Sequence, residues 1–314
     1  MVSGMLRAPD SPHRVVVVGG GAGGLELVTR LGDGLARRGR VEATLVERDR
    51  VHVWKPLLHE VAAGSLDPED HGLDYLAHAH WHHYRFRLGE MVGLDRAAKR
   101  VMLAPTFDEA GREVTPADSV PYDTLVIAIG SITNDFGTPG VREHAISLVT
   151  PDGAARFNRR LVNAILRAQT QAQPIRPGQL QVAIIGAGAT GTELAAELHR
   201  TVRQVTAFGL DRIDPDRDFR ITLIEAAPRI LPQLPERIAD ATTGILAELG
   251  VEVLANARVS EVRADGVHHA DGRLIPSELV IWSAGVRGPE VLAALDGLEV
   301  GRANQVVVLP TLQT

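Results

Sequence analysis

The sequence predicts an α/β fold that consists of two similar domains, each built on a parallel sheet. The strand pattern RVVVV at 14–18, apolar and β-branched from its second residue on, leads directly into a cluster of glycines and then into a helical pattern. The same order of strand, glycine cluster and helix begins again at residue 181, and the length of 314 residues suits about two domains. An internal repeat of this kind indicates two copies of one plan rather than one large domain.

The first copy begins with the strand at 14–18, whose four valines are apolar on both faces, as is typical of a parallel strand that is covered on both sides. A helix from Gly23 to Arg38 and a strand from Ala43 to Glu47 complete one βαβ unit. A later apolar strand at 123–129 runs into Gly130.

The second copy repeats these elements, so that the predicted first domain takes residues 1–150 and 290–314 and the second takes residues 151–289, nested within it. Turn-rich stretches of Gly, Pro and Asp mark the connections. The expected segments are strands at 181–185, 220–225 and 278–283, helices at 154–172 and 190–207, a connector at 173–178, an exposed polar insertion at 209–218 and a strand at 305–309.

The composition excludes several kinds of function. The formal net charge of -6 argues against a nucleic-acid surface, because binding a polyanion needs a basic face. The absence of cysteine excludes disulfides, cysteine-ligated metals and thiol redox chemistry within these residues, and fits a reducing compartment. No apolar run of about 18 residues predicts a transmembrane helix. The loose tail at 1–12 lacks the apolar stretch of a secretory signal.

The glycines after the first strand form the pattern G-x-G-x-x-G on Gly19, Gly21 and Gly24. Gly19 permits a tight turn, Gly21 lets the backbone approach a pyrophosphate, and Gly24 lets the helix pack closely on the strand. The start of the helix then offers free N–H groups and the positive end of its dipole to phosphates. Glu47, at the end of the next strand, is placed to accept hydrogen bonds from a ribose diol.

The second cluster repeats the pattern on Gly186, Gly188 and Gly191, and Glu225 ends the following strand. An acid at that position repels a 2′-phosphate, so this site is expected to prefer NAD over NADP, although the nearby Arg229 weakens the preference. Two dinucleotide sites in one chain indicate electron transfer from one dinucleotide to the other. A hydride transfer of this kind needs reacting atoms about 3–3.5 Å apart, which two juxtaposed domains can provide.

Beyond these motifs the sequence resembles the type II NADH dehydrogenases, the non-proton-pumping NADH:quinone oxidoreductases. The resemblance extends from about residue 14 to residue 314, and its most specific segment is WKPLLHEVA at 54–62. It implies two nested Rossmann-like domains of the glutathione-reductase type, with FAD bound by the first and NADH by the second. The other segments that carry it are VVVVGGGAGGLE at 15–26, GSL at 64–66, YDTLV at 122–126, Ser131, NDF at 134–136, GAGATGTEL at 186–194, RILP at 229–232 and WSAG at 282–285.

The resemblance also implies roles for individual residues. Lys55 to Leu58 are expected beside the flavin, where Lys55 would stabilise negative charge on the reduced flavin; a solvated lysine is the plainer alternative. Glu193 is expected near the nicotinamide, although an acid in the first turn of a helix also suits the helix dipole. Lys55 and Glu193 are therefore the predicted catalytic residues. The other predicted cofactor-binding residues are Gly19, Gly20, Gly21, Ala22, Gly23, Gly24, Glu47, Arg48, Pro56, Leu57, Leu58, Val92, Ala128, Gly130 and Ser131 for FAD, and Gly186, Gly188, Ala189, Thr190, Gly191, Glu225, Ala284 and Gly285 for NADH.

The sequence departs from the family pattern at its end. Family members continue past PTLQT at 310–314 with a Gly-Asp motif at the flavin, a quinone-side segment and amphipathic helices that dock on the membrane. The expectation is a C-terminally truncated chain that folds its NADH domain well, holds FAD loosely and does not reduce quinone. The complete protein is expected to be cytoplasmic and peripheral on the cytoplasmic face of the inner membrane. Its expected partners are a quinone and the membrane surface, and a homodimer stays open.

Several residues have a plainer interpretation beside the functional one. The histidines at 78, 80, 82 and 83 invite a metal site, but a solvated polar surface is favoured, and no metal is predicted. His59 and Glu60 are candidates for proton transfer near the flavin, or else they orient their loop. Trp54 and Trp282 are expected to serve packing rather than cofactor contact.

Other classes of flavoprotein and nucleotide-binding protein fit these residues less well or stay open. Disulfide reductases place a redox cysteine pair where this chain has residues 54–58, and sulfide:quinone oxidoreductases also need cysteines, so both are disfavoured. A ferredoxin-type or rubredoxin-type reductase stays open, as does a redox-inert sensor that binds NADH. A yellow protein that NADH bleaches would be an enzyme, whereas a colourless protein that binds NADH would not.

Overall fold

The structure is a computed structural model that describes residues 11–314. The chain divides into two compact units. The first unit comprises the residues up to 54, together with 72–131 and 287–314, and the second comprises 55–71 and 132–286. The tail expected at 1–12 lies mostly outside the described residues.

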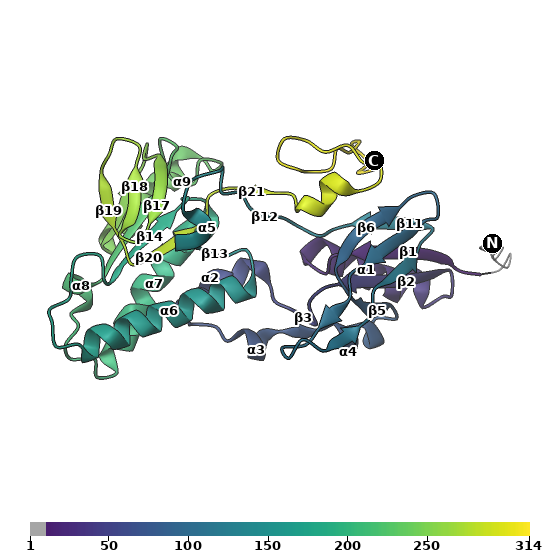
Figure 1. Ribbon diagram of the computed structural model, residues 1–314, viewed down its shortest axis with the longest axis horizontal. Helices are drawn as coiled ribbons and strands as arrows, with labels where there is room; N and C mark the ends of the chain where they lie inside the picture. The colour runs from purple at the N-terminus through teal and green to yellow at the C-terminus, as the bar shows by residue number, and fades with distance from the viewer. Residues whose placement is uncertain (1–10) are drawn as a thin grey trace. The chain divides into compact units, whose positions relative to one another are not determined.

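A parallel sheet forms the centre of the first unit, with the strand order β11-β1-β2-β5 (Figure 1). The two central strands are buried on both faces over residues 15–18 and 43–46, which explains why these stretches are almost entirely apolar. Val15 and Val17 pack into one core cluster, whereas Val16 and Val18 pack into another. The elements are β1 (His13–Val18), α1 (Ala22–Leu31), β2 (Val41–Glu47), α4 (Tyr75–Trp81), β5 (Arg85–Leu88) and β11 (Thr124–Ile127).

An antiparallel sheet with the order β10-β7-β6 contributes to the second of these clusters. Met91 and Leu103 from this sheet are buried together with Val16 and Val18, and so is Leu292. The elements are β6 (Met91–Asp95), β7 (Arg100–Leu103), β10 (Asp118–Pro121), the hairpin strands β8 (Thr106–Phe107) and β9 (Glu113–Thr115), the paired strands β3 (Val51–His52) and β4 (Leu73–Asp74), and the short helix η3 (Glu290–Ala294).

The second unit is built around a parallel sheet with the order β13-β20-β14-β15-β16. A second, antiparallel sheet has the order β17-β18-β19. The strands are β13 (Ala145–Ser147), β14 (Gln181–Ile185), β15 (Arg220–Ile224), β16 (Val251–Leu254), β17 (Val259–Arg263), β18 (Gly266–His269), β19 (Leu274–Pro276) and β20 (Leu279–Trp282), and the helices are α5 (Val141–His144), α6 (Pro151–Thr170), α7 (Ala189–Ala207), α8 (Pro215–Asp218) and α9 (Glu236–Glu248).

The two units repeat one topology. The order β20-β14-β15-β16 in the second unit corresponds to β11-β1-β2-β5 in the first, and all of these pairings are parallel. In both units the chain forms a three-stranded antiparallel sheet before it returns to the last strand of the parallel sheet. This sheet lies between β5 and β11 in the first unit and between β16 and β20 in the second. The predicted α/β fold with two copies of one plan is thus confirmed, and the copies agree more closely than the glycine motifs alone indicated.

The segment after Trp54 belongs to the second unit. It forms η2 (Lys55–Leu57), α2 (Leu58–Ala63) and α3 (Pro68–His71), and α2 packs against α6 and α7. Its apolar side chains Leu58 and Val61 are buried. The predicted division placed residues 55–71 and 132–150 in the first domain, whereas the compact units group them with the second, because of this packing and because β13 pairs with β20.

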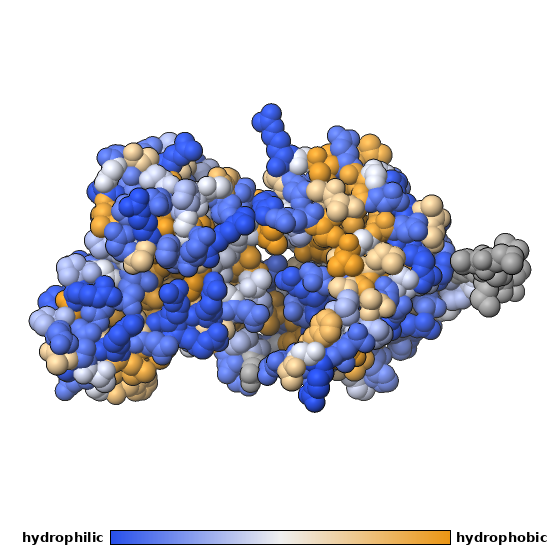
Figure 2. All heavy atoms as spheres, in the orientation of Figure 1, coloured by the Kyte–Doolittle hydropathy of each residue, from blue (hydrophilic) through white to orange (hydrophobic). Residues whose placement is uncertain are grey.

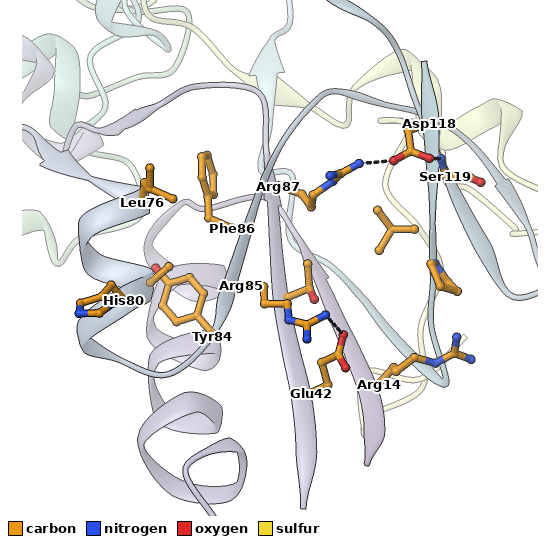
Figure 3. A pocket seen from close by; sticks show the side chains of 14 residues that line it. Arg14, Glu42, Leu76, His80, Tyr84, Arg85, Phe86, Arg87, Asp118 and Ser119 are labelled. Atoms are coloured by element: carbon orange, nitrogen blue, oxygen red, sulfur yellow. Dashed lines mark hydrogen bonds and ion pairs between the residues drawn. The ribbon is translucent and has the colours of Figure 1, made fainter. Parts of the chain in front are cut away.

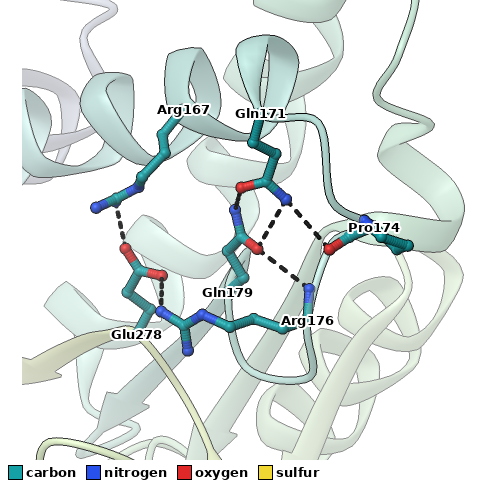
Figure 4. Close-up of polar contacts among 6 residues, drawn as sticks. All are labelled: Arg167, Gln171, Pro174, Arg176, Gln179 and Glu278. Atoms are coloured by element: carbon teal, nitrogen blue, oxygen red, sulfur yellow. Dashed lines mark hydrogen bonds and ion pairs between the residues drawn. The ribbon is translucent and has the colours of Figure 1, made fainter.

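A polar network closes the expected connector between α6 and β14 (Figure 4). The side-chain amides of Gln171 and Gln179 exchange hydrogen bonds of 3.2 and 2.7 Å, and Gln179 is buried. Glu278, just before β20, accepts from Arg167 at the end of α6 and from Arg176 in the connector. These contacts fix the end of α6 at the amino edge of the parallel sheet.

Three expected elements differ in the structure. The helix expected at 23–38 is α-helical only up to Leu31, and residues 32–36 form a π-helical turn instead. The change comes where Gly32 packs directly on the backbone of His82. Residues 305–309 form no strand, since only Val306 pairs, with Val300. The insertion at 209–218 contains α8 and buries Ile213.

Hydrophilic side chains cover most of the surface visible in Figure 2, and apolar side chains gather on the first unit where β6 and β11 lie in Figure 1. The partly buried residues Leu94, Leu125 and Ile127 of these strands pack against the second core cluster of that unit. Within residues 11–314, no helix is long and apolar enough to cross a bilayer.

Candidate functional site

The first glycine turn lies at the carboxyl end of β1. Gly19 has a backbone φ of +103°, which residues other than glycine rarely adopt, and a Cβ there would collide with the carbonyl of Ala128. Backbone hydrogen bonds from Gly19 to Val46 (2.8 Å) and from Ala128 to Val18 (2.7 Å) hold the turn between β2 and β11. The structure therefore brings together two predicted FAD-binding positions, Gly19 and Ala128.

The second glycine turn has the same construction at the end of β14. Gly186 has a φ of +101°, and a Cβ there would lie 2.6 Å from the backbone nitrogen of Ala284. Gly186 donates to Ile224 (2.8 Å), and Ser283 donates to Ile185 (2.7 Å). Carboxyl ends of parallel strands are the usual place for nucleotides in such sheets, and both turns lie there.

The two strand-end acids bind the glycine turns. The Glu47 carboxylate accepts the N–H of Gly20 at 2.5 Å and the N–H of Arg48 at 2.8 Å. In the second unit, Glu225 accepts the N–H of Ala187 at 2.8 Å. A carboxylate has about four acceptor positions, so each acid still has acceptor positions left for a ribose diol.

Both helices that follow the turns begin without a side-chain cap. The N-caps of α1 and α7 are Gly21 and Gly188, and neither makes a side-chain hydrogen bond to the first turn. A Cβ at Gly21, Gly23 or Gly188 would meet no atom within 4 Å. Ala22, Ala189 and Thr190 are exposed. Uncapped N–H groups and open space suit the diphosphate of a dinucleotide, so the residues fit FAD and NADH.

The segment expected beside the flavin presents Lys55 and Pro56 to solvent, while Leu57 is half-buried and Leu58 is buried. The next residue, His59, reaches the predicted catalytic Glu193 on α7, with 3.6 Å between its Nδ1 and the Glu193 carboxylate. The His59 Nδ1 is buried and has no hydrogen-bond partner among the described residues. Packing of α2 on α7 thus joins the WKPLLHE and GAGATGTE segments.

Further along α7, Glu197 lies in the same group of side chains. Burial opposes its ionisation, but hydrogen bonds from Arg200 and Ser65, with the charges of Arg200 and His59, lower the pKa of Glu197 below its ordinary value. Glu60 lies 3.9 Å from His59 Nε2. The carboxyl groups of Glu60, Glu193 and Glu197 therefore lie around one histidine.

Arg229 and the RILP segment support the second turn. The Arg229 guanidinium donates to the carbonyls of Leu231, Pro232 and Leu234. Leu231 in turn donates its backbone N–H to the carbonyl of Ala187 at 2.8 Å. Arg229 therefore holds its own loop in place beside the second turn, and its effect on the nucleotide preference stays a prediction.

The remaining predicted residues are dispersed around the turns. Arg48 is exposed and pairs with Asp49, and Val92 is an exposed residue of β6. Gly130 is exposed, Ser131 is half-buried, and Gly285 lies against the ring of Phe136. Trp282 is buried, as expected for packing, and donates its indole N–H to the carbonyls of Asn134 and Ala284, whereas Trp54 is 48% exposed.

Two of the four histidines near α4 bond to other side chains. His78 lies 2.9 Å from the hydroxyl of Tyr84 and stacks on His82, which pairs with Asp33. Within the described part of the chain, no group of three or more His, Cys, Asp or Glu side chains could hold a metal ion.

Two cavities lie at the opposite, amino ends of the parallel sheets. One of about 580 Å³ is lined by Arg14, Glu42 and Arg85 at the starts of β1, β2 and β5, and by β10 (Figure 3). Another of about 550 Å³ is lined by the corresponding residues of β14, β15 and β16, and by β19. A cavity at the same place in both copies follows from the shared architecture, and both cavities lie at the sheet edge opposite the glycine turns.

Comparisons with known proteins agree with this arrangement. Residues 13–314 match the family described as pyridine nucleotide-disulphide oxidoreductase. The chain is 40% identical over 312 residues to the type II NADH:quinone oxidoreductase of Haemophilus influenzae, covering 96% of this chain and 70% of that protein. It is 30% identical to the type II NADH:quinone oxidoreductase Ndh of Mycobacterium tuberculosis, covering 97% of this chain and 65% of that protein. Among solved structures, NDH2 from Plasmodium falciparum matches with a TM-score of 0.79 at 20% identity, and the match covers 90% of this chain and 57% of that one.

The chain thus spans about two thirds of the length of these curated relatives. The family predicted from the WKPLLHE segment and the paired glycine motifs is confirmed, as is the fold. The match over 13–314 and the identity to the Haemophilus influenzae protein show that this chain belongs to the type II NADH:quinone oxidoreductases.

Proposed function

We propose that the chain binds FAD at the first glycine turn and NADH at the second, and that the complete protein passes electrons from NADH through FAD to a membrane quinone. The observation that carries this proposal is the duplicated arrangement of turn, uncapped helix and strand-end acid in a chain of this family. When bound, FAD supplies the acceptor for a hydride from NADH and the donor for a quinone.

The residues of the chain bind and orient the two dinucleotides. Glu47 and Glu225 offer carboxylate oxygens to the two adenosine riboses, while the starts of α1 and α7 offer N–H groups to the diphosphates. Glu225 also disfavours the 2′-phosphate of NADPH. Binding of this kind positions the reacting groups and excludes the wrong nucleotide.

Three side chains of the second unit are assigned to charge and proton handling. Lys55 offers a positive charge to the reduced flavin, and Glu193 lies at the nicotinamide. His59, 3.6 Å from Glu193, is placed to exchange a proton with it. The uptake of one proton accompanies quinone reduction by NADH, which gives such a pair a task.

We further propose that the complete protein works peripherally on the cytoplasmic face of the inner membrane, as either a monomer or a homodimer. Quinones are confined to the membrane, so an acceptor of this class requires a docking surface there. The net charge of -6 favours no nucleic-acid partner.

The proposal is tested by purifying the chain, measuring flavin absorbance per chain, and following NADH oxidation with ferricyanide and with a soluble quinone. A yellow protein that NADH bleaches, and that NADPH bleaches much more slowly, is the expected result. A colourless protein that binds NADH without oxidising it after FAD is supplied would overturn the proposal and identify an NADH-binding sensor.

A further inference from the structure

The second position of the first glycine turn is crowded by a tyrosine. The motif G-x-G-x-x-G leaves this position free, yet the residue here is Gly20. A Cβ at Gly20 would lie 2.5 Å from the hydroxyl oxygen of Tyr75 and 2.6 Å from its ring carbon Cζ. Real Cβ atoms do not approach other atoms this closely, so Gly20 and Tyr75 depend on each other.

Tyr75 has little freedom to move away. It is 2% exposed, begins α4 directly after the N-cap Asp74, and stacks on Phe86 with 5.5 Å between the ring centroids. Burial raises the pKa of Tyr75, so its hydroxyl stays protonated. That hydroxyl donates to the carbonyl of Gly20 at 2.6 Å, and His52 Nδ1 lies 3.1 Å from it.

In the second unit, the equivalent carbonyl is held by a backbone group and not by a side chain. The equivalent carbonyl, that of Ala187, accepts from the backbone N–H of Leu231 at 2.8 Å. The residue at this position is alanine and it is fully buried, so the turn itself tolerates a Cβ. The requirement for glycine in the first turn therefore comes from Tyr75 and not from the turn.

The carbonyl held by Tyr75 determines the direction of the next N–H group. A trans peptide is planar, so the N–H of Gly21 points opposite to the carbonyl of Gly20. Gly21 is the N-cap of α1, and no atom lies within 4 Å of its Cβ position. A hydroxyl that anchors the carbonyl on the buried side thereby presents the N–H toward the diphosphate site.

We propose that Tyr75 is a positioning residue for FAD, which locks the first glycine turn through the Gly20 carbonyl and requires glycine at position 20. The ligand in this proposal rests on the proposed function. The coupling between Gly20 and Tyr75 does not, because it is a property of the folded chain.

The test uses Tyr75→Phe, Gly20→Ala, Tyr75→Leu and the double variant Gly20→Ala/Tyr75→Leu in the whole chain. Tyr84→Phe is the matched control, because Tyr84 is also buried and bonded to a histidine but does not touch the turn. Tyr75→Phe should weaken FAD binding about tenfold, the size of one lost buried hydrogen bond, whereas Tyr84→Phe should leave it unchanged. NADH affinity, measured by fluorescence, should stay constant in every variant.

Gly20→Ala should abolish FAD uptake and lower the unfolding temperature in the wild-type background. In the Tyr75→Leu background the same substitution should have little further effect, since the phenol is gone. Equal losses in both backgrounds, or unchanged FAD affinity in Tyr75→Phe, would overturn the proposal. If the wild-type chain takes up no FAD, the proposed function fails, and the unfolding temperatures of the four variants still decide whether the coupling exists.

Discussion

At the scale of single residues, the two strand-end acids occupy equivalent places but are assigned different tasks. Glu225 accepts the N–H of Ala187, and the guanidinium of Arg229, four residues later, is hydrogen-bonded to three carbonyls of its own loop. Neither residue forms an ion pair with the other, so the Glu225 carboxylate keeps acceptor positions for a ribose.

We expect a preference for NADH over NADPH of about a hundredfold in kcat/KM, from repulsion of the 2′-phosphate and loss of hydroxyl contacts. Glu225→Ser should reduce this ratio to roughly tenfold or less, because it removes the repelling charge. Steady-state kinetics with both nucleotides measures the ratio, and Glu47→Ser is the control for the other site. Equal kcat/KM for the two nucleotides in the wild-type chain would contradict the assignment.

Glu197 gives a second residue-scale prediction, on pH. Burial disfavours its charge, yet Arg200 and Ser65 lower the folded-state pKa below the ordinary value of 4.5. The unfolded chain then binds the proton first, so the carboxylate stabilises the fold above about pH 4.5 and this contribution is lost as the pH falls through the folded-state pKa.

Glu197→Gln should therefore lower the free energy of unfolding by about 1 kcal/mol at pH 7, a modest amount because Arg200 is solvent-exposed. The difference from wild type should shrink toward pH 3. Urea unfolding across this range measures it, with the exposed Glu248→Gln as the control. A difference that grows as the pH falls would show that the sign is wrong.

At the scale of elements, α2 explains why residues 55–71 join the second unit. Its C-cap residue Gly64 has a φ of +89°, and a Cβ there would lie 2.6 Å from Nδ2 of Asn158 on α6. Asn158 also donates to the carbonyl of Ala62 at 3.3 Å. The end of α2 is thus fitted closely to α6.

Gly64→Ala should destabilise the chain more than Gly272→Ala does. Gly272 has the same φ of +89° but no atom within 4 Å of its Cβ position. Backbone strain alone costs about 1–2 kcal/mol at both sites, and the contact with Asn158 adds to it only at Gly64. Denaturant unfolding measures both, and an Asn158→Ala background should remove the excess. Equal effects of the two substitutions would mean that α2 does not pack on α6 in this way.

At the scale of the whole molecule, one topology occurs twice, with different supports at equivalent positions. Tyr75 anchors the first turn through its side chain, whereas Leu231 anchors the second through its backbone. The first unit carries the hairpin β8–β9, and the second carries the additional strand β13. Equivalent positions in the two copies therefore have different neighbours.

Amide hydrogen exchange can assign the two sites in one experiment. FAD should slow exchange at 20–25, and NADH should slow exchange at 187–192, because each ligand covers the N–H groups at the start of α1 or α7. The antiparallel sheet β17–β18–β19 serves as an internal control that neither ligand should protect. Protection of 20–25 by NADH and of 187–192 by FAD would reverse the assignment.

The local patterns of the sequence predicted the two parallel sheets, both glycine turns and both strand-end acids. An apolar run, a glycine cluster and the start of a helix are set by neighbours within a few residues, so they can be recognised without the fold. The strand expected at 305–309 was wrong for the complementary reason, because a strand needs a partner and only Val306 has one, in Val300.

The segments that support the site are far apart in the sequence and meet only in the folded chain. Tyr75 meets Gly20 across 55 positions of the chain, and Asn158 meets Ala62 across 96. The glycine at position 20 was the one sequence signal of a close neighbour there, but it did not say which residue that neighbour is. Local sequence patterns are therefore enough to predict the two nucleotide-binding copies and their acids. The packing of α2 on α6 and α7 is different, and so is the anchoring of each turn. Both depend on contacts that exist only once the chain has folded.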